Sequence, residues 1–201
     1  MDPEQSVVVI IDHQPQMYFG VESAGRQLIE NNVLGLAKAA KVFKVPCILT
    51  TIEADTFSGK LFSKLQAVCP REVPIDRTCI NGWEDERLRR AVADTGRTKI
   101  LLAGLWTEAC VAFPALCMKS EGFDVYAVTD ACGGASKDAH RMAVTRMVQA
   151  GVVPVTWQQV MLEFQRDWNN KDTYDAVMAI VKEHGGAYGL GAEYVETMVT
   201  Q

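Results

Sequence analysis

The sequence lacks the features that place a protein in a membrane or on a nucleic acid. No apolar run approaches the roughly 18 residues that a helix needs to cross a bilayer. No early segment combines the basic start, apolar middle and cleavage site of a signal peptide. The net charge of −5 provides no broad basic surface for nucleic acid or an anionic membrane. We therefore expect a cytoplasmic protein with neither kind of partner.

Paired cysteines are also missing. No two cysteines form a C-x-x-C pair, which argues against thioredoxin-type redox chemistry and against a zinc ribbon. In a chain of this length without a signal peptide, an even number of cysteines does not predict a disulfide framework. We expect most of them to be small, buried and reduced. They are Cys47, Cys69, Cys79, Cys110, Cys117 and Cys132.

The remaining composition is that of an ordinary globular protein. The chain has 201 residues, of which 48% are apolar and 22% charged, and a chain of this size can bury a substantial core. It contains no internal repeat, no low-complexity segment and no convincing linker. We therefore expect a single domain over residues 1–201.

Short apolar runs alternate with helical patterns along the chain. The runs are rich in Val and Ile and do not alternate with polar residues, which is typical of strands buried on both faces of a parallel sheet. We therefore predict an α/β fold, a three-layer αβα sandwich with a mainly parallel, Rossmann-like sheet. The predicted strands are 7–11, 47–51, 100–103, 125–129 and 152–156, with a short extra strand around 74–80; the helical patterns cover about 29–43, 84–93, 108–121, 136–150 and 172–184.

Polar residues gather where the predicted strands end. In an open parallel sheet, ligands bind beyond the carboxyl ends of the strands. Asp12 and Asp130 each end an apolar run, Glu53 lies just past another, and Cys110 follows a short loop after a third. These side chains are expected at one rim, although strand-end carboxylates also cap helices and order loops.

Cys110 can be a buried structural thiol, a redox thiol, a metal ligand or a nucleophile. If a helix begins near Glu108, the thiol lies in its first turn, where free N–H groups favour a thiolate and could hold an oxyanion. Pro114 cannot donate a helical hydrogen bond to the carbonyl of Cys110, so an irregular helix start is predicted. The residues alone leave the structural thiol and the nucleophile both open.

A nucleophilic cysteine needs a base, and the few histidines supply no obvious one. A histidine is the usual partner, and the chain has three. His184 is expected to cap a helix end, His140 to lie on or near a helix surface, and His13 to point away from the site. The base is therefore not identified by this reasoning.

The order and spacing of three motifs resemble the isochorismatase-like cysteine hydrolases, which include nicotinamidases and N-carbamoyl amidases. The motifs are 8-VVIIDHQ-14, 104-GLWTEACV-111 and 124-DVYAVTDACGG-134. The resemblance implies a triad of Asp, Lys and Cys, with Asp12 as the base and Cys110 as the nucleophile. It also implies a cis peptide between Leu105 and Trp106, and an oxyanion hole formed by the backbone N–H groups of Trp106 and Cys110.

The lysine of that triad has no counterpart here. The segment 74-PIDRTCINGWEDERL-88 contains no lysine, and Arg77 is its nearest cation. The pattern is similar to the YcaC-like subgroup, in which arginine stands before an I-N-x-W element, here residues 80–83. Arginine stays charged and cannot shuttle a proton, but it can stabilise a thiolate and a carboxylate.

The metal ligands of nicotinamidases are also absent. The resemblance places them after the second strand, where 49-LTTIEADTF-57 contains no histidine. Neutral imidazole is the group that would hold such an ion. We therefore expect no metal and no cofactor.

The expected function is hydrolysis of an amide-type C–N bond in a small molecule, through a thioester on Cys110. An isochorismatase-type vinyl ether hydrolase and a non-catalytic small-molecule-binding protein are the alternatives. Candidate walls of the substrate pocket are Phe57, Trp83, Trp106 and Phe113. The resemblance further implies a homo-oligomer, a tetramer or octamer, and the apolar residues within 187–201 fit an oligomer contact as well as they fit a frayed tail.

Overall fold

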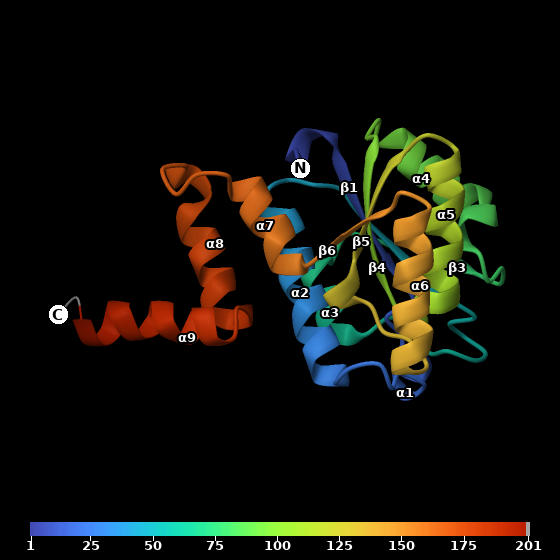
Figure 1. The fold of residues 1–201 in the computed structure, drawn as a ribbon, viewed down its shortest axis with the longest axis horizontal. Coiled ribbons are helices and arrows are strands. Elements are labelled where there is room, and N and C mark those ends of the chain that lie inside the picture. Colours follow the sequence, from blue (N-terminus) through green and yellow to red (C-terminus); the bar gives the residue numbers. More distant parts are fainter. Residues whose placement is uncertain (200–201) are drawn as a thin grey trace.

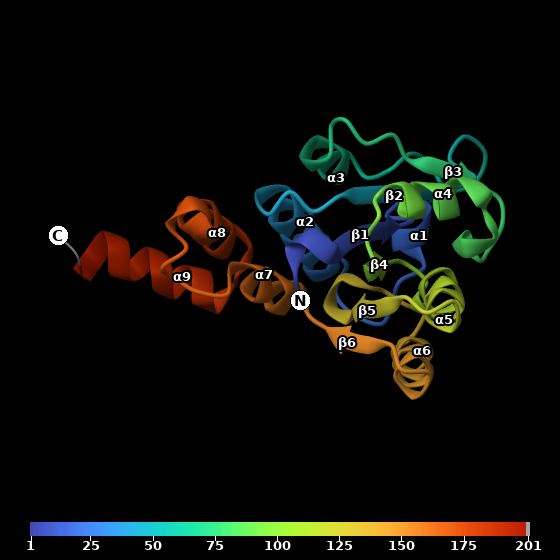
Figure 2. The same cartoon turned by 90° about the horizontal axis from the view of Figure 1, so that it is seen from above.

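The computed structural model of the protein describes residues 1–199 and has the predicted sandwich architecture. Its six strands form one sheet in the order β3-β2-β1-β4-β5-β6, and every described pairing is parallel. Helices cover both faces of this sheet (Figure 2). The strands are β1 (Ser6–Ile11), β2 (Cys47–Ile52), β3 (Ile75–Arg77), β4 (Lys99–Gly104), β5 (Asp124–Val128) and β6 (Val153–Val155).

The central strand β1 has no polar face because both of its faces are covered. Val8 and Ile10 pack into one cluster with residues of α2, α3, α7 and α8. Val7, Val9 and Ile11 pack into the opposite cluster with residues of α4, α5 and α6. The helices are α1 (Pro15–Phe19), α2 (Arg26–Val42), α3 (Ser63–Val68), α4 (Glu86–Asp94), α5 (Ala112–Ser120), α6 (Lys137–Gln149), α7 (Trp157–Gln165), α8 (Lys171–His184) and α9 (Ala187–Tyr194).

The irregular helix start predicted from Pro114 is confirmed. Residues Thr107–Val111 form a single π-type turn, and regular α5 begins only at Ala112. A proline N has no hydrogen to donate, so the regular pattern cannot include the carbonyl of Cys110. Cys110 therefore lies inside the π-type turn rather than on a regular helix.

The structure adds helices that the sequence patterns did not predict. The apolar run around β6 ends in Thr156, which is the N-cap of α7 and accepts a hydrogen bond from the N–H of Gln159. Helices α1 and α3 have only one buried side chain each, Met17 and Leu65, and such short segments show no helical period. Ser136 caps α6 as predicted.

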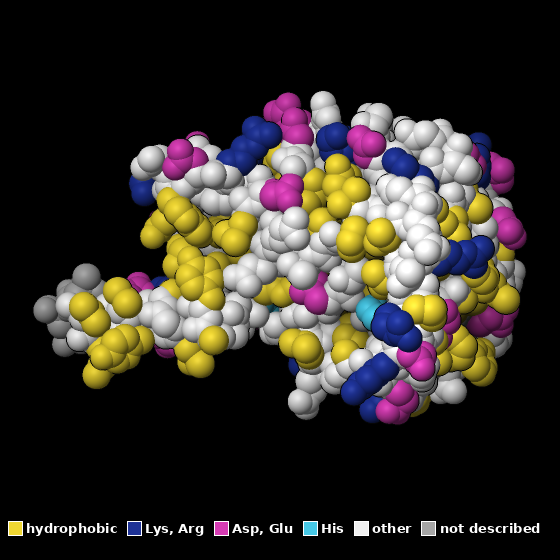
Figure 3. All heavy atoms as spheres, in the orientation of Figure 1, with side chains coloured by type: hydrophobic (Ala, Val, Ile, Leu, Met, Phe, Trp, Pro, Cys, Tyr) yellow, Lys and Arg dark blue, Asp and Glu magenta, His cyan; other side chains and the backbone are white. Residues whose placement is uncertain are grey.

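The C-terminal helices form an arm that extends away from the sandwich (Figure 1). Helix α8 packs on α2 through Val177, Ile180 and Val181, whereas α9 and the π-type turn Val195–Val199 extend outward. Apolar side chains lie exposed along this part of the chain (Figure 3). They are Tyr188, Leu190, Tyr194, Val195, Met198 and Val199. Residues 200–201 of the predicted contact segment lie outside the described residues.

None of the described helices is long and apolar enough to span a bilayer.

Candidate active site

Three neighbouring strands end at residues with left-handed backbone. Asp12, Glu53 and Trp106 follow the ends of β1, β2 and β4, with φ angles of 55°, 49° and 58°. This conformation is uncommon outside glycine and costs on the order of 1–3 kcal/mol per residue. Strain of this kind clusters at functional sites, and three of the five non-glycine residues with positive φ in 1–199 lie at this edge of the sheet.

Asp12 is completely buried at this edge. Its Oδ1 accepts a hydrogen bond from Oγ1 of Thr50 over 2.8 Å, and its Oδ2 accepts one from Nη2 of Arg77. Burial raises the pKa of Asp12, while Arg77, Thr50 and Cys110 act in the opposite direction. The carboxylate is thus a stronger base than a surface aspartate, yet it remains paired.

Arg77 leaves the end of β3, and its side chain is fully buried. One end of its guanidinium bonds to Asp12, and Nη1 donates to the backbone carbonyls of Cys79 and Ile80. Gly82 leaves room for it, because a Cβ there would lie 3.2 Å from Nε of Arg77. The turn after β3 therefore holds this cation in one fixed orientation.

Cys110 is 5% exposed, and both Asp12 and Arg77 lie close enough to act on the pKa of its thiol. Burial, followed by the charge of Asp12, raises the pKa of the thiol to about 12, although Arg77 opposes this. The expected low-pKa thiolate is therefore not the resting form: at neutral pH the thiol is protonated beside a carboxylate. Its own N–H donates to the carbonyl of Trp106 over 2.9 Å, so this donor is not free to stabilise a thiolate.

The expected cis peptide between Leu105 and Trp106 is wrong. Residues 1–199 contain no cis peptide bond, and Trp106 instead adopts a left-handed conformation with φ 58° and ψ 61°. This conformation turns the chain and lets the Trp106 carbonyl accept hydrogen bonds from the N–H groups of Ala109 and Cys110, each over 2.9 Å. The Cys110 N–H would have to leave or share this bond to hold an oxyanion.

The four candidate wall residues have different surroundings. Trp106 is 37% exposed, and its indole packs on Gly20 and donates to the carbonyl of Met17 over 3.4 Å. Phe57 lies exposed in the loop after β2, and Phe113 is half-buried. Trp83 is buried against Phe123 and Arg89, in the core rather than at the rim.

None of the three histidines is hydrogen-bonded to Cys110. His13 is completely buried beside Tyr18, with Nδ1 2.8 Å from the Tyr18 hydroxyl, and burial lowers its pKa to about 3. His184 lies at the end of α8 as expected, but its Nδ1 faces the side-chain oxygen of Asn31. His140 is half-buried near the surface of α6, as expected, and its Nδ1 lies 2.9 Å from Oγ1 of Thr107, in the turn that carries Cys110.

Sequence reasoning missed two polar residues that build the site. Thr50, in the apolar strand β2, orients Asp12. Gln14 is buried, and its side-chain amide bonds to the backbone N–H and carbonyl of Ile52 and to the carbonyl of Gly59, which fixes the loop after β2. A buried polar residue needs such partners, so the polar Thr50 inside the predicted strand 47–51 was an available signal, whereas Gln14 stands in a polar run and offered none.

The remaining carboxylates at the rim have structural contacts. Asp130 accepts a hydrogen bond from the N–H of Trp157 over 2.9 Å, at the start of α7. Glu53 bonds to the hydroxyl of Thr56 within its own loop. Within residues 1–199, no group of three or more His, Cys, Asp or Glu side chains is arranged to hold a metal ion.

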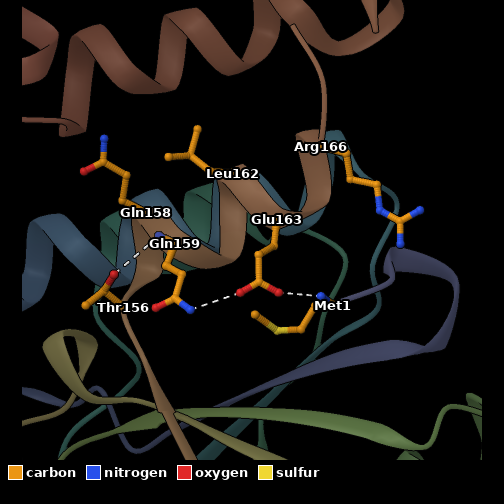
Figure 4. A pocket seen from close by; sticks show the side chains of 7 residues that line it. All are labelled: Met1, Thr156, Gln158, Gln159, Leu162, Glu163 and Arg166. Carbon is orange, nitrogen blue, oxygen red and sulfur yellow. Dashed lines mark hydrogen bonds and ion pairs between the residues drawn. The ribbon is translucent and has the colours of Figure 1, made fainter.

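Two hollows on the surface lie away from these side chains. An open hollow of about 690 Å³ lies along α7 (Figure 4), and another of about 1140 Å³ lies between α8 and α9. Neither is lined by Asp12, Arg77 or Cys110. The first is lined by Met1, Thr156, Gln158, Gln159, Leu162, Glu163 and Arg166.

Comparison with known proteins assigns the family. The sequence matches the isochorismatase domain over residues 6–159. The chain belongs to the isochorismatase family. It is 40% identical over 171 residues to YcaC of Escherichia coli (strain K12), a match that covers 85% of this chain and 82% of that protein. It is 27% identical over 184 residues to isochorismatase domain-containing protein 2A of Mus musculus, covering 90% and 84% of the two chains.

Two solved structures are similar over almost their full length. YcaC from Pseudomonas aeruginosa, with hexane-2,5-diol and covalent acrylamide, has a TM-score of 0.93 and 36% identity. YcaC from Escherichia coli, described as an octameric hydrolase of unknown specificity, has a TM-score of 0.94 and 36% identity. Each match covers 98% of this chain and 97% of the other. The chain is therefore a YcaC-like member of a hydrolase family, and its α/β fold is the fold of that family.

Proposed function

We propose that this member of the isochorismatase family is a cysteine hydrolase that cleaves an amide-type C–N bond of a small molecule. The observation that carries the proposal is the buried ion pair of Asp12 and Arg77, both of which lie close enough to Cys110 to act on the pKa of its thiol. A thiol next to a buried base and a fixed cation is the arrangement that nucleophilic catalysis requires.

The first half-reaction begins with proton transfer. As the sulfur of Cys110 attacks the substrate carbonyl, Asp12 takes the thiol proton, and burial has already raised the proton affinity of this carboxylate. Arg77 cannot take part in proton transfer. Its fixed charge stabilises negative charge wherever it resides, on the sulfur or on the carboxylate.

The nitrogen leaves with the proton held by Asp12, and a thioester on Cys110 remains. Water then attacks the thioester carbonyl and gives its proton to Asp12, which restores the free thiol and releases a carboxylic acid. The backbone N–H groups of Trp106 and Cys110 are the proposed oxyanion donors in both steps. The Cys110 N–H reaches the oxyanion by sharing its hydrogen bond to the Trp106 carbonyl.

One structural relative supports a reactive nucleophile in this family. The Pseudomonas aeruginosa protein contains covalently attached acrylamide, which is a small electrophile with a primary amide. The substrate walls proposed here are Phe57, Trp106 and Phe113 near the rim, and Trp83 is proposed only to support the turn that holds Arg77.

The proposal is tested by screening small primary amides and N-carbamoyl compounds for ammonia release, with an intact-mass search for an acyl group on Cys110. Wild type is compared with Cys110→Ser and Asp12→Asn, and with Cys117→Ser as a control at a half-buried cysteine. We expect both site variants to lose turnover and the control to retain it.

Two other results would identify the alternative functions. Turnover of a vinyl ether that survives Cys110→Ser would indicate an isochorismatase-type reaction without a covalent intermediate. Saturable binding without turnover, unaffected by Asp12→Asn, would indicate a non-catalytic binding protein.

We also propose that the protein is a homo-oligomer, a tetramer or an octamer, with residues 187–199 at a contact between copies. The similar Escherichia coli structure is octameric, and the arm exposes Leu190 and Met198, each 69% exposed. Large exposed apolar patches mark association surfaces. Light scattering after chromatography should show dissociation of Leu190→Glu/Met198→Glu, whereas Val73→Glu, on an exposed loop residue, should remain assembled. Equal masses for the wild type, the double variant and Val73→Glu would contradict the assignment of residues 187–199 to a contact between copies.

A further inference from the structure

The turn Thr107–Val111, which carries Cys110, is hydrogen-bonded to the segment between β5 and α6. The N–H of Thr107 donates to the carbonyl of Gly133 over 3.0 Å, and the N–H of Gly133 donates back to the carbonyl of Gly104 over 3.1 Å. Leu105 and Gly133 form an isolated parallel bridge beside these bonds. The chain that leads into the turn Thr107–Val111 thus continues the pairing of β4 beyond the end of the sheet.

Side chains extend this attachment to α6 itself. Thr107 is completely buried, and its Oγ1 lies 2.9 Å from Nδ1 of His140 in the first turn of α6. Oε1 of Glu108 accepts a hydrogen bond from the N–H of Ala135 over 2.9 Å. The two elements are so close that a Cβ on Gly134 would lie 2.7 Å from Oε2 of Glu108 and 3.0 Å from Cβ of His140.

These attachments act on the thiol through the backbone of the turn. The carbonyl of Trp106, which precedes Thr107, accepts the N–H groups of Ala109 and Cys110. Any shift of Thr107 therefore moves the group that Cys110 is bonded to. On the opposite side, Asp12 and Arg77, which follow or end β1 and β3, lie close enough to act on the pKa of the Cys110 thiol.

We propose that His140, through its hydrogen bond to Thr107, is a positioning residue that holds Cys110 in register with Asp12 and Arg77. The inference rests on the proposed function, because the register matters only if Cys110 is the nucleophile. His140 does not touch the triad. Its effect should therefore fall on the rate of the chemical step and not on binding of the small molecule.

The effect is measured with acrylamide as the probe, by intact mass and peptide mapping. The Cys110 sulfur bonds to the terminal alkene carbon, and the thiol proton ends on the carbon next to the amide. The dependence of the rate on acrylamide concentration separates the limiting rate from the half-saturating concentration.

A displacement of about 1 Å at a reacting group costs on the order of 100-fold in rate, so we expect His140→Ala and Thr107→Val each to lower the limiting rate by about 10-fold to 100-fold. The half-saturating concentration should stay within about twofold, because neither residue contacts the probe.

Three further variants separate positioning from general loosening. His140→Asn keeps a polar atom at the position of Nδ1 and should restore the limiting rate to within about threefold of wild type. The double variant His140→Ala/Thr107→Val should be no slower than the slower single variant, because both substitutions remove the same hydrogen bond. Ser136→Ala removes the N-cap of the same helix and should leave the limiting rate unchanged. Urea unfolding of each variant shows that it is folded at the assay temperature.

Wild-type rates for His140→Ala and Thr107→Val, an equal loss in Ser136→Ala, or additive losses in the double variant would each overturn the positioning role. The proposed function fails in a different way. In that case wild-type Cys110 would react no faster than the half-buried Cys79 and Cys117, and Asp12→Asn would not change its rate. That result would overturn both proposals, whereas a fast, Asp12-dependent reaction indifferent to His140 would overturn only the second.

Discussion

Arg77 donates a hydrogen bond from Nη2 to Oδ2 of Asp12, and both side chains are completely removed from solvent. Removing one partner of a buried ion pair leaves the other charge uncompensated, which typically costs about 3–5 kcal/mol. We therefore expect Arg77→Met to lower the free energy of unfolding by about this amount, measured by urea denaturation at pH 7. Asp12→Asn/Arg77→Met removes both charges and should recover part of the loss. A cost below about 1 kcal/mol for Arg77→Met would show that the pair is not buried as described.

Gly82 determines whether the arginine fits. A Cβ at this position would lie 3.2 Å from Nε of Arg77 and 3.3 Å from Cδ2 of Leu88, so Gly82→Ala should displace the guanidinium. We expect a loss of stability of about 1–3 kcal/mol from overpacking, together with slower alkylation of Cys110. Gly25→Ala is the matched control, because its Cβ would meet nothing within 4 Å. Equal alkylation rates in the two variants would mean that the position of Arg77 has no influence on the thiol.

The pH dependence of Cys110 alkylation should follow the carboxylate and not the thiol alone. The pKa of Cys110 is raised to about 12, so little thiolate is present at neutral pH, and reaction there depends on Asp12 as the base. Protonation of Asp12 removes that base, and its pKa is raised by burial. The rate of iodoacetamide labelling should therefore fall as the pH drops through this raised value. In Asp12→Asn the acid limb should disappear and reactivity should remain only in alkaline solution. An unchanged profile in Asp12→Asn would rule out base assistance.

His13 should make the fold sensitive to mild acid. Burial lowers its pKa from 6.5 to about 3, so below pH 6.5 the unfolded chain binds a proton that the native protein does not bind. Stability is then lost as the pH falls from 6.5 toward 3, and the contribution amounts to about 2 kcal/mol between pH 7.5 and pH 5. Urea unfolding at these two pH values should show this loss in wild type and a smaller loss in His13→Gln. His140 and His184 also have lowered pKa values, so His140→Asn is measured in parallel. An identical loss in wild type and His13→Gln would exclude His13 as the source.

The strands were predictable from the sequence for a simple physical reason. The predicted and observed ends of the five main strands agree within one residue, because runs of Val and Ile buried on both faces are hard to place anywhere else. The positions of Asp12 and Cys110 after strand ends made them candidates, and the resemblance to a known family supplied their expected roles and the candidate Arg77. In the structure Asp12 and Arg77 form an ion pair, and both act on the pKa of the Cys110 thiol; their catalytic roles stay a prediction.

Features that depend on contacts between distant segments were not predictable. His140 was expected on or near a helix surface and is half-buried there, but its hydrogen bond to Thr107, which belongs to another element, was not predicted. Thr156 completes an apolar run in the sequence, yet it caps α7. The left-handed backbone of Trp106 and the raised pKa of Cys110 are products of close packing at the sheet edge, which local sequence patterns do not report.

The pairing of Asp12 with Arg77 also determines what kind of molecule the site attracts. The two charges cancel, and the thiol beside them is neutral, so these three side chains have a local dipole but no net charge among themselves. Such a site exerts little long-range attraction on ions, and buried pairs are screened only weakly by salt. An uncharged molecule should therefore be turned over at nearly the same rate in dilute buffer and in molar salt, and a charged analogue of the same shape should have to shed its hydration without compensation.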